Sequence, residues 1–240
     1  MNKKKTNYLL AAIVKKFGQL PKGKTLDLGC GDGDYSAALQ KLGFDVLAGD
    51  IDEHRFRHHG QIPFQCCDMT RPLPFAKEAF DYVILMEALE HLKNPYDVLA
   101  EIHRVIKKGG SLVLSTPNIL SLKSRLRFFF EGAYDYFREA PLDQSRNPKE
   151  KIFNLHLFPY RYQELEYLLN KSGFGITDIF TSRYEHYGLE VLVPLMRWQA
   201  LSKERRSAKK GGAAYGRINK ILLSKELLYG RHLIVNAKKD

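Results

Sequence analysis

Short apolar runs recur along the chain, and each ends in polar or glycine residues, as buried strands that lead into turns do. The stretches between them carry apolar residues three and four positions apart, which predicts helices. Seven strands are predicted in this way: Thr25–Leu28, Leu42–Asp50, Phe64–Asp68, Phe80–Leu85, Gly109–Asn118, Phe174–Thr181 and Leu233–Ala237. Strands that alternate with helices indicate an α/β fold, with a mostly parallel sheet and helices on both faces.

Helical periodicity extends over most of the remaining chain. The predicted helices are Tyr8–Val14, one beginning near Asp34, Pro95–Ile106, Leu120–Glu131, Tyr160–Lys171 and residues 215–228. We expect the first, which is amphipathic, to cover the edge of the sheet. Its apolar run is short and ends at two lysines, which argues against a signal peptide. The length fits a single domain over residues 1–240. Residues 188–228 form an apolar and basic helical elaboration before the last strand.

The sequence Thr25-Leu-Asp-Leu-Gly-Cys-Gly-Asp-Gly33 is the most informative stretch of the chain. Glycines lack Cβ, so the backbone can turn sharply and approach a ligand closely. A helix starting near Asp34 then directs free N–H groups at whatever occupies the loop. The stretch therefore predicts a nucleotide-binding loop. Its glycines lie at alternate positions, whereas dinucleotide-binding enzymes favour G-x-G-x-x-G.

Carboxylates end the second and third predicted strands. Asp50 lies about 20 residues beyond the glycines, where such folds place an acid on the ribose hydroxyls. Asp68 ends the next strand, although it could instead be a helix cap or turn residue. Asp81, at the start of the fourth strand, is interpreted as a strand-boundary residue. Because parallel strands align their carboxyl ends, a ligand crevice is expected at that edge of the sheet.

From Leu26 to Asn118, the order and wording of these blocks resemble the class I S-adenosylmethionine-dependent methyltransferases of the type 11 and type 23 groups. Within them the chain is similar to O-methyltransferases of the ubiquinone pathway and of bacterial cell-surface glycan clusters. The resemblance implies a Rossmann-like sheet of seven strands with the last strand antiparallel. It also implies a substrate-side helical insertion after strand five, at residues 118–154.

The resemblance assigns cofactor contacts residue by residue. The methionine part of S-adenosylmethionine would be surrounded by Asp27, Gly29, Cys30, Gly31 and Gly33 and closed by the backbone around Met86. Asp50 would hold the ribose, with Ile51 against the adenine. Asp68 would accept a hydrogen bond from the adenine amino group, with Met69 beside it.

The candidate catalytic residues are Glu87, Glu90 and His91. They are three and four positions apart, so we expect them to share one helical face at the end of strand four. His91, oriented by a carboxylate, is a candidate general base. The three also resemble the metal-binding block of ubiquinone-pathway O-methyltransferases and of small-RNA 2′-hydroxyl methyltransferases, in which His156 would be a fourth ligand. The same Glu-x-x-Glu-His pattern is widespread in relatives without a metal, so we expect a site with no resident metal.

The composition adds a basic surface. The net charge is +11, and basic residues cluster at the N-terminus, at residues 123–127 and at Lys203–Lys210. Such a surface favours an anionic partner, although it can also be a solvated face. The apolar run Leu189–Trp198 directly precedes the last cluster and favours peripheral contact with an anionic membrane over binding to nucleic acid, which would need a recognisable module. A core helix with a basic loop is the other interpretation.

Three functions remain open on these grounds. The first is a cytoplasmic methyltransferase that acts on a hydroxyl of a small or lipid- or glycan-linked acceptor, with the metal-dependent RNA 2′-O-methyltransferase as its variant. The second is a nicotinamide oxidoreductase, and the third is a catalytically silent cofactor-binding subunit. Three cysteines without a disulfide or zinc spacing fit a reducing compartment, and no run reaches the roughly 20 apolar residues of a membrane span.

Overall fold

A computed structural model describes residues 7–138, 156, 158–208 and 215–240. The predicted polar stretch Pro141–Glu150 and the lysines at positions 3–5, 209 and 210 lie outside the described residues, as does most of the second half of the predicted insertion. Among the described residues, no helix is long and apolar enough to cross a bilayer.

The sheet has seven strands in the order β3-β2-β1-β4-β5-β7-β6. The strands are β1 (Lys24–Leu28), β2 (Asp45–Asp50), β3 (Phe64–Cys66), β4 (Phe80–Met86), β5 (Ile106–Pro117), β6 (Phe174–Phe180) and β7 (His232–Lys239). The first five pair in parallel, and β7 is antiparallel to both of its neighbours. This topology confirms the predicted Rossmann-like fold. The strand order reverses at β1 and β4, where open α/β sheets form their ligand crevice.

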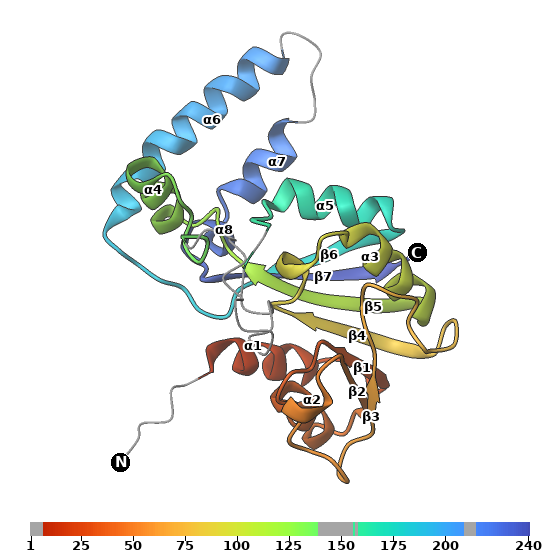
Figure 1. Ribbon diagram of the computed structural model, residues 1–240. Helices are drawn as coiled ribbons and strands as arrows, with labels where there is room; N and C mark the ends of the chain where they lie inside the picture. Colours follow the sequence, from red (N-terminus) through yellow and green to blue (C-terminus); the bar gives the residue numbers. More distant parts are fainter. Residues whose placement is uncertain (1–6, 139–155, 157, 209–214) are drawn as a thin grey trace, which may run out of the picture.

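Helices cover both faces of the sheet (Figure 1). The helices are α1 (Tyr8–Phe17), α2 (Asp34–Lys41), α3 (Pro95–Val105), α4 (Leu122–Glu131), α5 (Tyr162–Lys171), α6 (Val193–Ala208), α7 (Tyr215–Leu222) and α8 (Lys225–Tyr229). The short 3-10 turns are η1 (Glu53–Arg55), η2 (Leu89–His91) and η4 (Leu189–Leu192). Helices α3 and α5 bury apolar side chains in one of the two large core clusters, and α1 and α2 do so in the other.

Helix α1 covers a face of the sheet, so the prediction that it lies over the edge is wrong. Its residues Leu9, Ile13 and Phe17 are buried in one cluster with Ile84 and Val113 of the two central strands β4 and β5. These three positions are four apart and give α1 an apolar stripe along its whole length. A strand edge offers backbone groups rather than an apolar surface, so such a stripe needs a sheet face to bury it.

Two predicted boundaries in the C-terminal elaboration differ from the structure. Residues 215–228 form two helices rather than one, because the Ser224 hydroxyl accepts a hydrogen bond from the Leu227 N–H at 3.4 Å and caps a new helix. Helix α6 continues through the charge run as far as Ala208. Arginine and lysine are good helix formers, so a run of basic residues does not end a helix.

Candidate active site

A cavity of about 280 Å³ opens at the carboxyl edge of the sheet, beside the ends of β1, β2 and β4. Glu87 and His91 line it. Of the residues that the sequence assigns to the cofactor, it brings together Gly29, Asp50, Ile51, Asp68, Met69 and Met86. The lining does not include the other four assigned residues, which are Asp27 of β1 and the glycine-loop residues Cys30, Gly31 and Gly33.

The glycine loop is fastened to the end of β2. The backbone N–H groups of Gly29 and Cys30 both donate to the Gly49 carbonyl, at 2.7 and 3.2 Å. Gly33 has φ +86°, and a Cβ there would lie 2.5 Å from the Phe56 ring. This glycine therefore serves close packing at the start of α2. Burial raises the pKa of the Cys30 thiol, which favours a thiol fitted by size over a reactive one.

Asp50 is held in one orientation by the loop that it faces. Its Oδ2 accepts the Gly31 N–H at 2.8 Å, and its Oδ1 accepts the Asp52 N–H at 2.9 Å. Each carboxylate oxygen can accept more than one hydrogen bond. Asp50 thus keeps acceptor capacity toward the cavity, as a ribose contact requires.

Asp68 lines the cavity and also stabilises a turn. Its Oδ1 accepts from the Thr70 N–H at 2.8 Å and from the Thr70 hydroxyl at 2.7 Å. These bonds, with Arg71 nearby, hold the pKa of Asp68 below its usual range. The turn role considered from the sequence is present, and the adenine contact stays a prediction for the other oxygen.

Asp27 lies beneath the loop and is shielded from solvent. Its carboxylate accepts the Ser36 hydroxyl at 2.6 Å. Burial raises its pKa to about 7, and the Ser36 hydrogen bonds offset only part of this rise. A carboxyl that keeps its proton well above pH 4 is a consequence of burial that the motif alone does not reveal.

The expected helical face of Glu87, Glu90 and His91 is wrong. Glu87 has φ +49°, and only Leu89–His91 form a single 3-10 turn. A left-handed residue breaks the helical period, so the two carboxylates point to different places. Glu87 accepts the Ser115 hydroxyl at 2.8 Å, whereas Glu90 is fully buried and its two oxygens have no hydrogen-bond partner among the described residues.

Glu90 instead meets two histidines. One ligand atom from each of Glu90, His91 and His156 lies within 4.8 Å of the others, and the two imidazole rings are 4.9 Å apart. His156 Nδ1 is 2.9 Å from the Tyr136 carbonyl. A carbonyl only accepts, so Nδ1 carries a proton, and Nε2 lies 3.8 Å from Glu90 Oε1. The predicted four-residue set is therefore reduced to three, without Glu87.

Burial controls the protonation of both carboxyl groups. It raises the pKa of Glu87 to about 7, against the lowering effect of the Ser115 hydrogen bond. It raises the pKa of Glu90 well above the usual range, and the nearby Glu87 charge raises it further. Burial therefore favours the protonated form of Glu90, and a cation bound beside it would favour the carboxylate.

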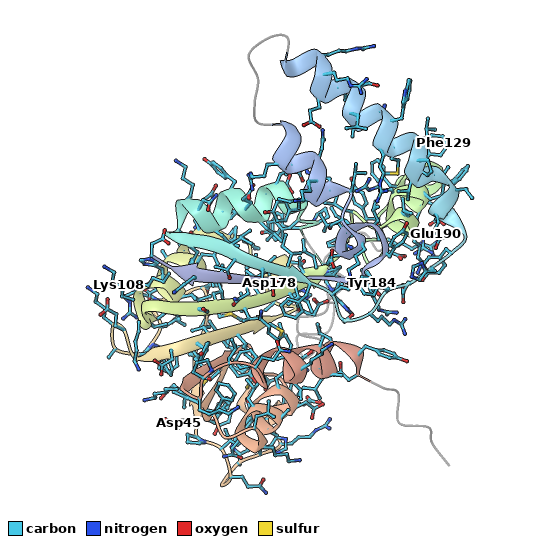
Figure 2. The ribbon with its side chains drawn as sticks, turned by 180° about the vertical axis from the view of Figure 1, so that it is seen from behind. Asp45, Lys108, Phe129, Asp178, Tyr184 and Glu190 are labelled. Atoms are coloured by element: carbon cyan, nitrogen blue, oxygen red, sulfur yellow. The ribbon has the colours of Figure 1, made fainter. Side chains whose placement is uncertain are left out.

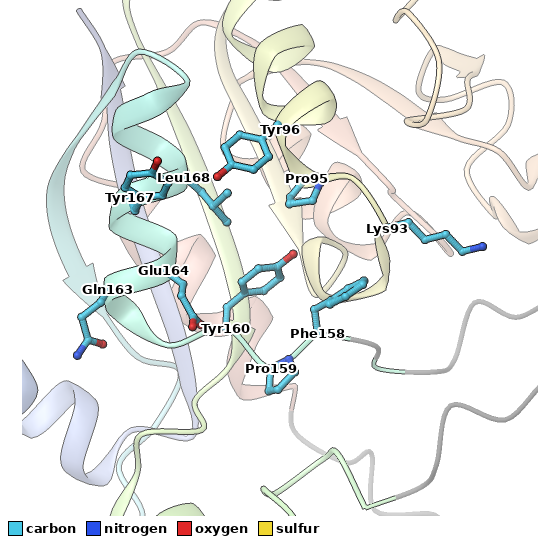
Figure 3. Close-up of a pocket in the computed structure, with 10 residues that line it drawn as sticks. All are labelled: Lys93, Pro95, Tyr96, Phe158, Pro159, Tyr160, Gln163, Glu164, Tyr167 and Leu168. Carbon is cyan, nitrogen blue, oxygen red and sulfur yellow. The ribbon is translucent and has the colours of Figure 1, made fainter.

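A second cavity, of about 520 Å³, lies next to the first, between the start of α3 and α5. Figure 3 shows Tyr96, Phe158 and Tyr160 around it, with Lys93 at its rim. Lys93 lines both cavities. This cleft was not predicted from the sequence. It forms only where α5 packs beside α3, and neither helix carries a sequence motif that predicts this contact.

Comparisons with known proteins agree with this geometry. A family model described as a methyltransferase domain matches residues 26–114. A ubiquinone/menaquinone biosynthesis C-methyltransferase from Desulfotalea psychrophila is 36% identical over 109 residues, which are 42% of this chain and 44% of that protein. A ubiquinone biosynthesis O-methyltransferase from Sinorhizobium fredii is 27% identical over 71% of this chain and 70% of its own length. The chain thus spans less than half the length of the first of these relatives.

Solved structures share the fold along nearly the whole chain. A methyltransferase structure from Bacillus halodurans superposes with a TM-score of 0.61 at 20% identity, covering 96% of this chain and 98% of that one. One from Thermotoga maritima, described as a possible histamine N-methyltransferase, gives a TM-score of 0.59 at 16% identity. At such identities the likeness supports the fold and leaves the acceptor open.

Proposed function

Because the chain belongs to the class I S-adenosylmethionine-dependent methyltransferases, we propose that it transfers a methyl group from this cofactor to a hydroxyl of a small or lipid- or glycan-linked acceptor. One observation carries the proposal. A single cavity joins cofactor-type residues, with Asp50 foremost, to two groups that can accept a proton, Glu87 and His91. The three free cysteines fit action in the reducing cytoplasm.

The residues present fit the cofactor. The oriented Asp50 carboxylate would accept the ribose hydroxyls, and the apolar side chains of Ile51 and Met69 would flank the adenine. Gly29, where a Cβ would approach Met69 Cε to 3.2 Å, leaves room for the methionine part. When bound, the cofactor supplies a sulfonium methyl that needs little further activation.

The protein's part is then to align the acceptor, exclude water and take its proton. His91 is our candidate for the group that accepts the hydroxyl proton, since it lines the cavity at the end of β4. Glu90, within 4.8 Å of it, would act as a positioning residue. Glu87, whose Oε1 accepts the Ser115 hydroxyl, would orient the acceptor with its other carboxyl oxygen.

The acceptor can be identified by following an isotope-labelled methyl group from S-adenosylmethionine into fractionated host extract, with His91→Ala as control. We expect label in the lipid or glycan fraction and none with the variant. Label confined to RNA would favour the RNA variant. Cofactor binding without label in any fraction would overturn the enzymatic proposal in favour of a silent binding subunit.

Asp50→Ala should weaken S-adenosylmethionine binding by about 10- to 100-fold, because a hydrogen bond to a charged group contributes about 1.5–3 kcal/mol. Isothermal titration calorimetry measures this directly. Asp45→Ala, at the other end of the same strand (labelled in Figure 2), is the matched control and should bind as the parent does. Equal affinity of the two variants would refute the ribose assignment.

A second candidate mechanism uses a divalent cation held by Glu90, His91 and His156. It is favoured by the buried Glu90 carboxyl, whose oxygens have no hydrogen-bond partner among the described residues, and by His156 Nε2, which lies 3.8 Å from one of them. A cation there would lower the pKa of an acceptor hydroxyl bound to it, which suits RNA 2′-O-methylation as well as other hydroxyls.

Chelation separates the two mechanisms. If His91 acts as a general base without a metal, dialysis against EDTA should leave the rate of methyl transfer unchanged, because the reaction then needs no cation. Activity lost on chelation and restored by Mn²⁺ or Mg²⁺ would replace this mechanism by the metal-assisted one. Titration of Mn²⁺ into the parent and into Glu90→Gln gives a readout that is independent of activity.

A further inference from the structure

Large apolar side chains of α4, η4 and α6 are exposed together at one end of the molecule. Phe129 is 79% exposed, Val191 78% and Trp198 66%. We define the α4–α6 patch as these three with the other exposed apolar side chains of the same elements: Phe128, Phe130, Leu192, Leu195 and Leu201. A soluble protein seldom exposes so many large apolar side chains in one region without a partner for them.

These side chains belong to one surface. Leu122 of α4 and Val193 of α6 are buried in the same small cluster with Leu228 of α8, so both helices pack around one apolar centre. Leu195, Trp198 and Leu201 are three positions apart and therefore follow one side of α6, away from the buried Val193. Figure 2 shows Phe129 beside the start of α6, at the opposite end of the molecule from Lys108.

The charges around the patch are mostly positive. Lys203, Arg205 and Arg206 are exposed on the same helix, and the chain as a whole carries +11. Two of the nearby carboxylates are paired, Glu131 with Arg127 and Arg138, and Glu190 with His186, while Glu204 lies among the basic residues of α6. A second copy docking on this patch would bring like charges together, which disfavours a dimer. An anionic surface would be complementary.

We propose that the α4–α6 patch docks on an anionic lipid bilayer. Leu195, Trp198 and Leu201 enter the interface, and the basic residues of α6 contact the lipid phosphates. The patch lies at the same edge of the sheet as the cavity, because β5 passes from Ser115, which bonds Glu87, into α4 within a few residues. Docking would thus present the cavity to acceptors anchored in the bilayer. This last step rests on the proposed function, whereas docking itself does not.

The chain contains a single tryptophan, Trp198, so its fluorescence reports on the patch alone. Vesicles of phosphatidylcholine with phosphatidylglycerol should shift its emission to the blue, and added salt should reverse much of the shift. Pure phosphatidylcholine vesicles should have little effect. An unchanged spectrum with anionic vesicles would overturn the proposal, as would emission already blue-shifted in a dimer without vesicles.

Variants assign the binding to the patch. In vesicle sedimentation, Trp198→Ser should weaken binding by about tenfold, since the ring is a large apolar surface, and Arg205→Glu by at least about fivefold. Tyr167→Ser on α5 and Lys108→Glu at the far end are the matched controls, and both should bind as the parent does. Equal loss in variants and controls would show that binding is unspecific and would overturn the assignment.

The vesicle experiments involve no methyl transfer, so they succeed or fail independently of the enzymatic proposal. Docking combined with label only in water-soluble fractions would overturn the anchored acceptor. Docking combined with label in lipid would support both proposals together.

Discussion

His91→Gln should lower kcat for methyl transfer by about 10²- to 10⁴-fold while leaving the affinity for S-adenosylmethionine unchanged. General-base catalysis contributes this much when the base is removed, and glutamine keeps the polar shape of the site without a titrating group. Single-turnover transfer of labelled methyl into the acceptor fraction gives the rate, and calorimetry gives the affinity.

Two results would contradict the role of His91. A rate within a few-fold of the parent would show that the acceptor loses its proton elsewhere. A loss of rate that accompanies loss of Mn²⁺ binding would assign His91 to the cation site with Glu90 and His156 instead. His103→Gln is the matched control, since that half-buried imidazole packs against Phe174 and does not line the cavity.

Asp27→Asn should stabilise the protein increasingly as the pH rises from about 4 to 7. The pKa of Asp27 is raised to about 7 in the folded chain, and the unfolded carboxyl ionises near pH 4. The stability that protonated Asp27 contributes to the folded parent is therefore fully present below about pH 4 and is lost as the pH rises to about 7. The difference of about three pKa units corresponds to at most about 4 kcal/mol.

Urea unfolding of parent and variant at several pH values, without cofactor, measures this difference. Asparagine can still accept the Ser36 hydrogen bond, and other buried carboxyls such as Glu87 are common to both proteins and cancel. The exposed Asp45→Asn should track the parent at every pH. Parallel curves for Asp27→Asn and the parent would mean that Asp27 ionises normally.

Two strand ends were predictable from sequence because glycine or aspartate bounds the apolar run: β1 ends at Leu28 and β2 at Asp50, as predicted. β3 ends at Cys66, two residues before the predicted Asp68, because Asp68 instead stabilises a turn with Thr70. β5 begins three residues earlier than predicted, at Ile106. The glycines at 109 and 110 signal a helix end, but they lie within the strand, where Gly109 has φ +74° and the pairing with β4 is irregular.

The convergence of the assigned residues was predictable only in part. Asp50 and Asp68 share the cavity because parallel strands align their ends. The separation of Glu87 from Glu90 depends on a left-handed residue that has no sequence signal in a non-glycine position. The approach of His156 to Glu90 is set by contacts far apart in the chain, which no periodicity encodes.

The interior position of β7 determines the order in which the sheet can be completed. β5 and β6 do not pair with each other, because residues 232–239 of β7 lie between them and pair with both. During synthesis the outer edge of β5 therefore stays open while the insertion, β6 and the apolar α6 emerge. An open edge is a template for wrong pairing. The chain should thus depend on chaperones during this interval, before its final strand closes the sheet.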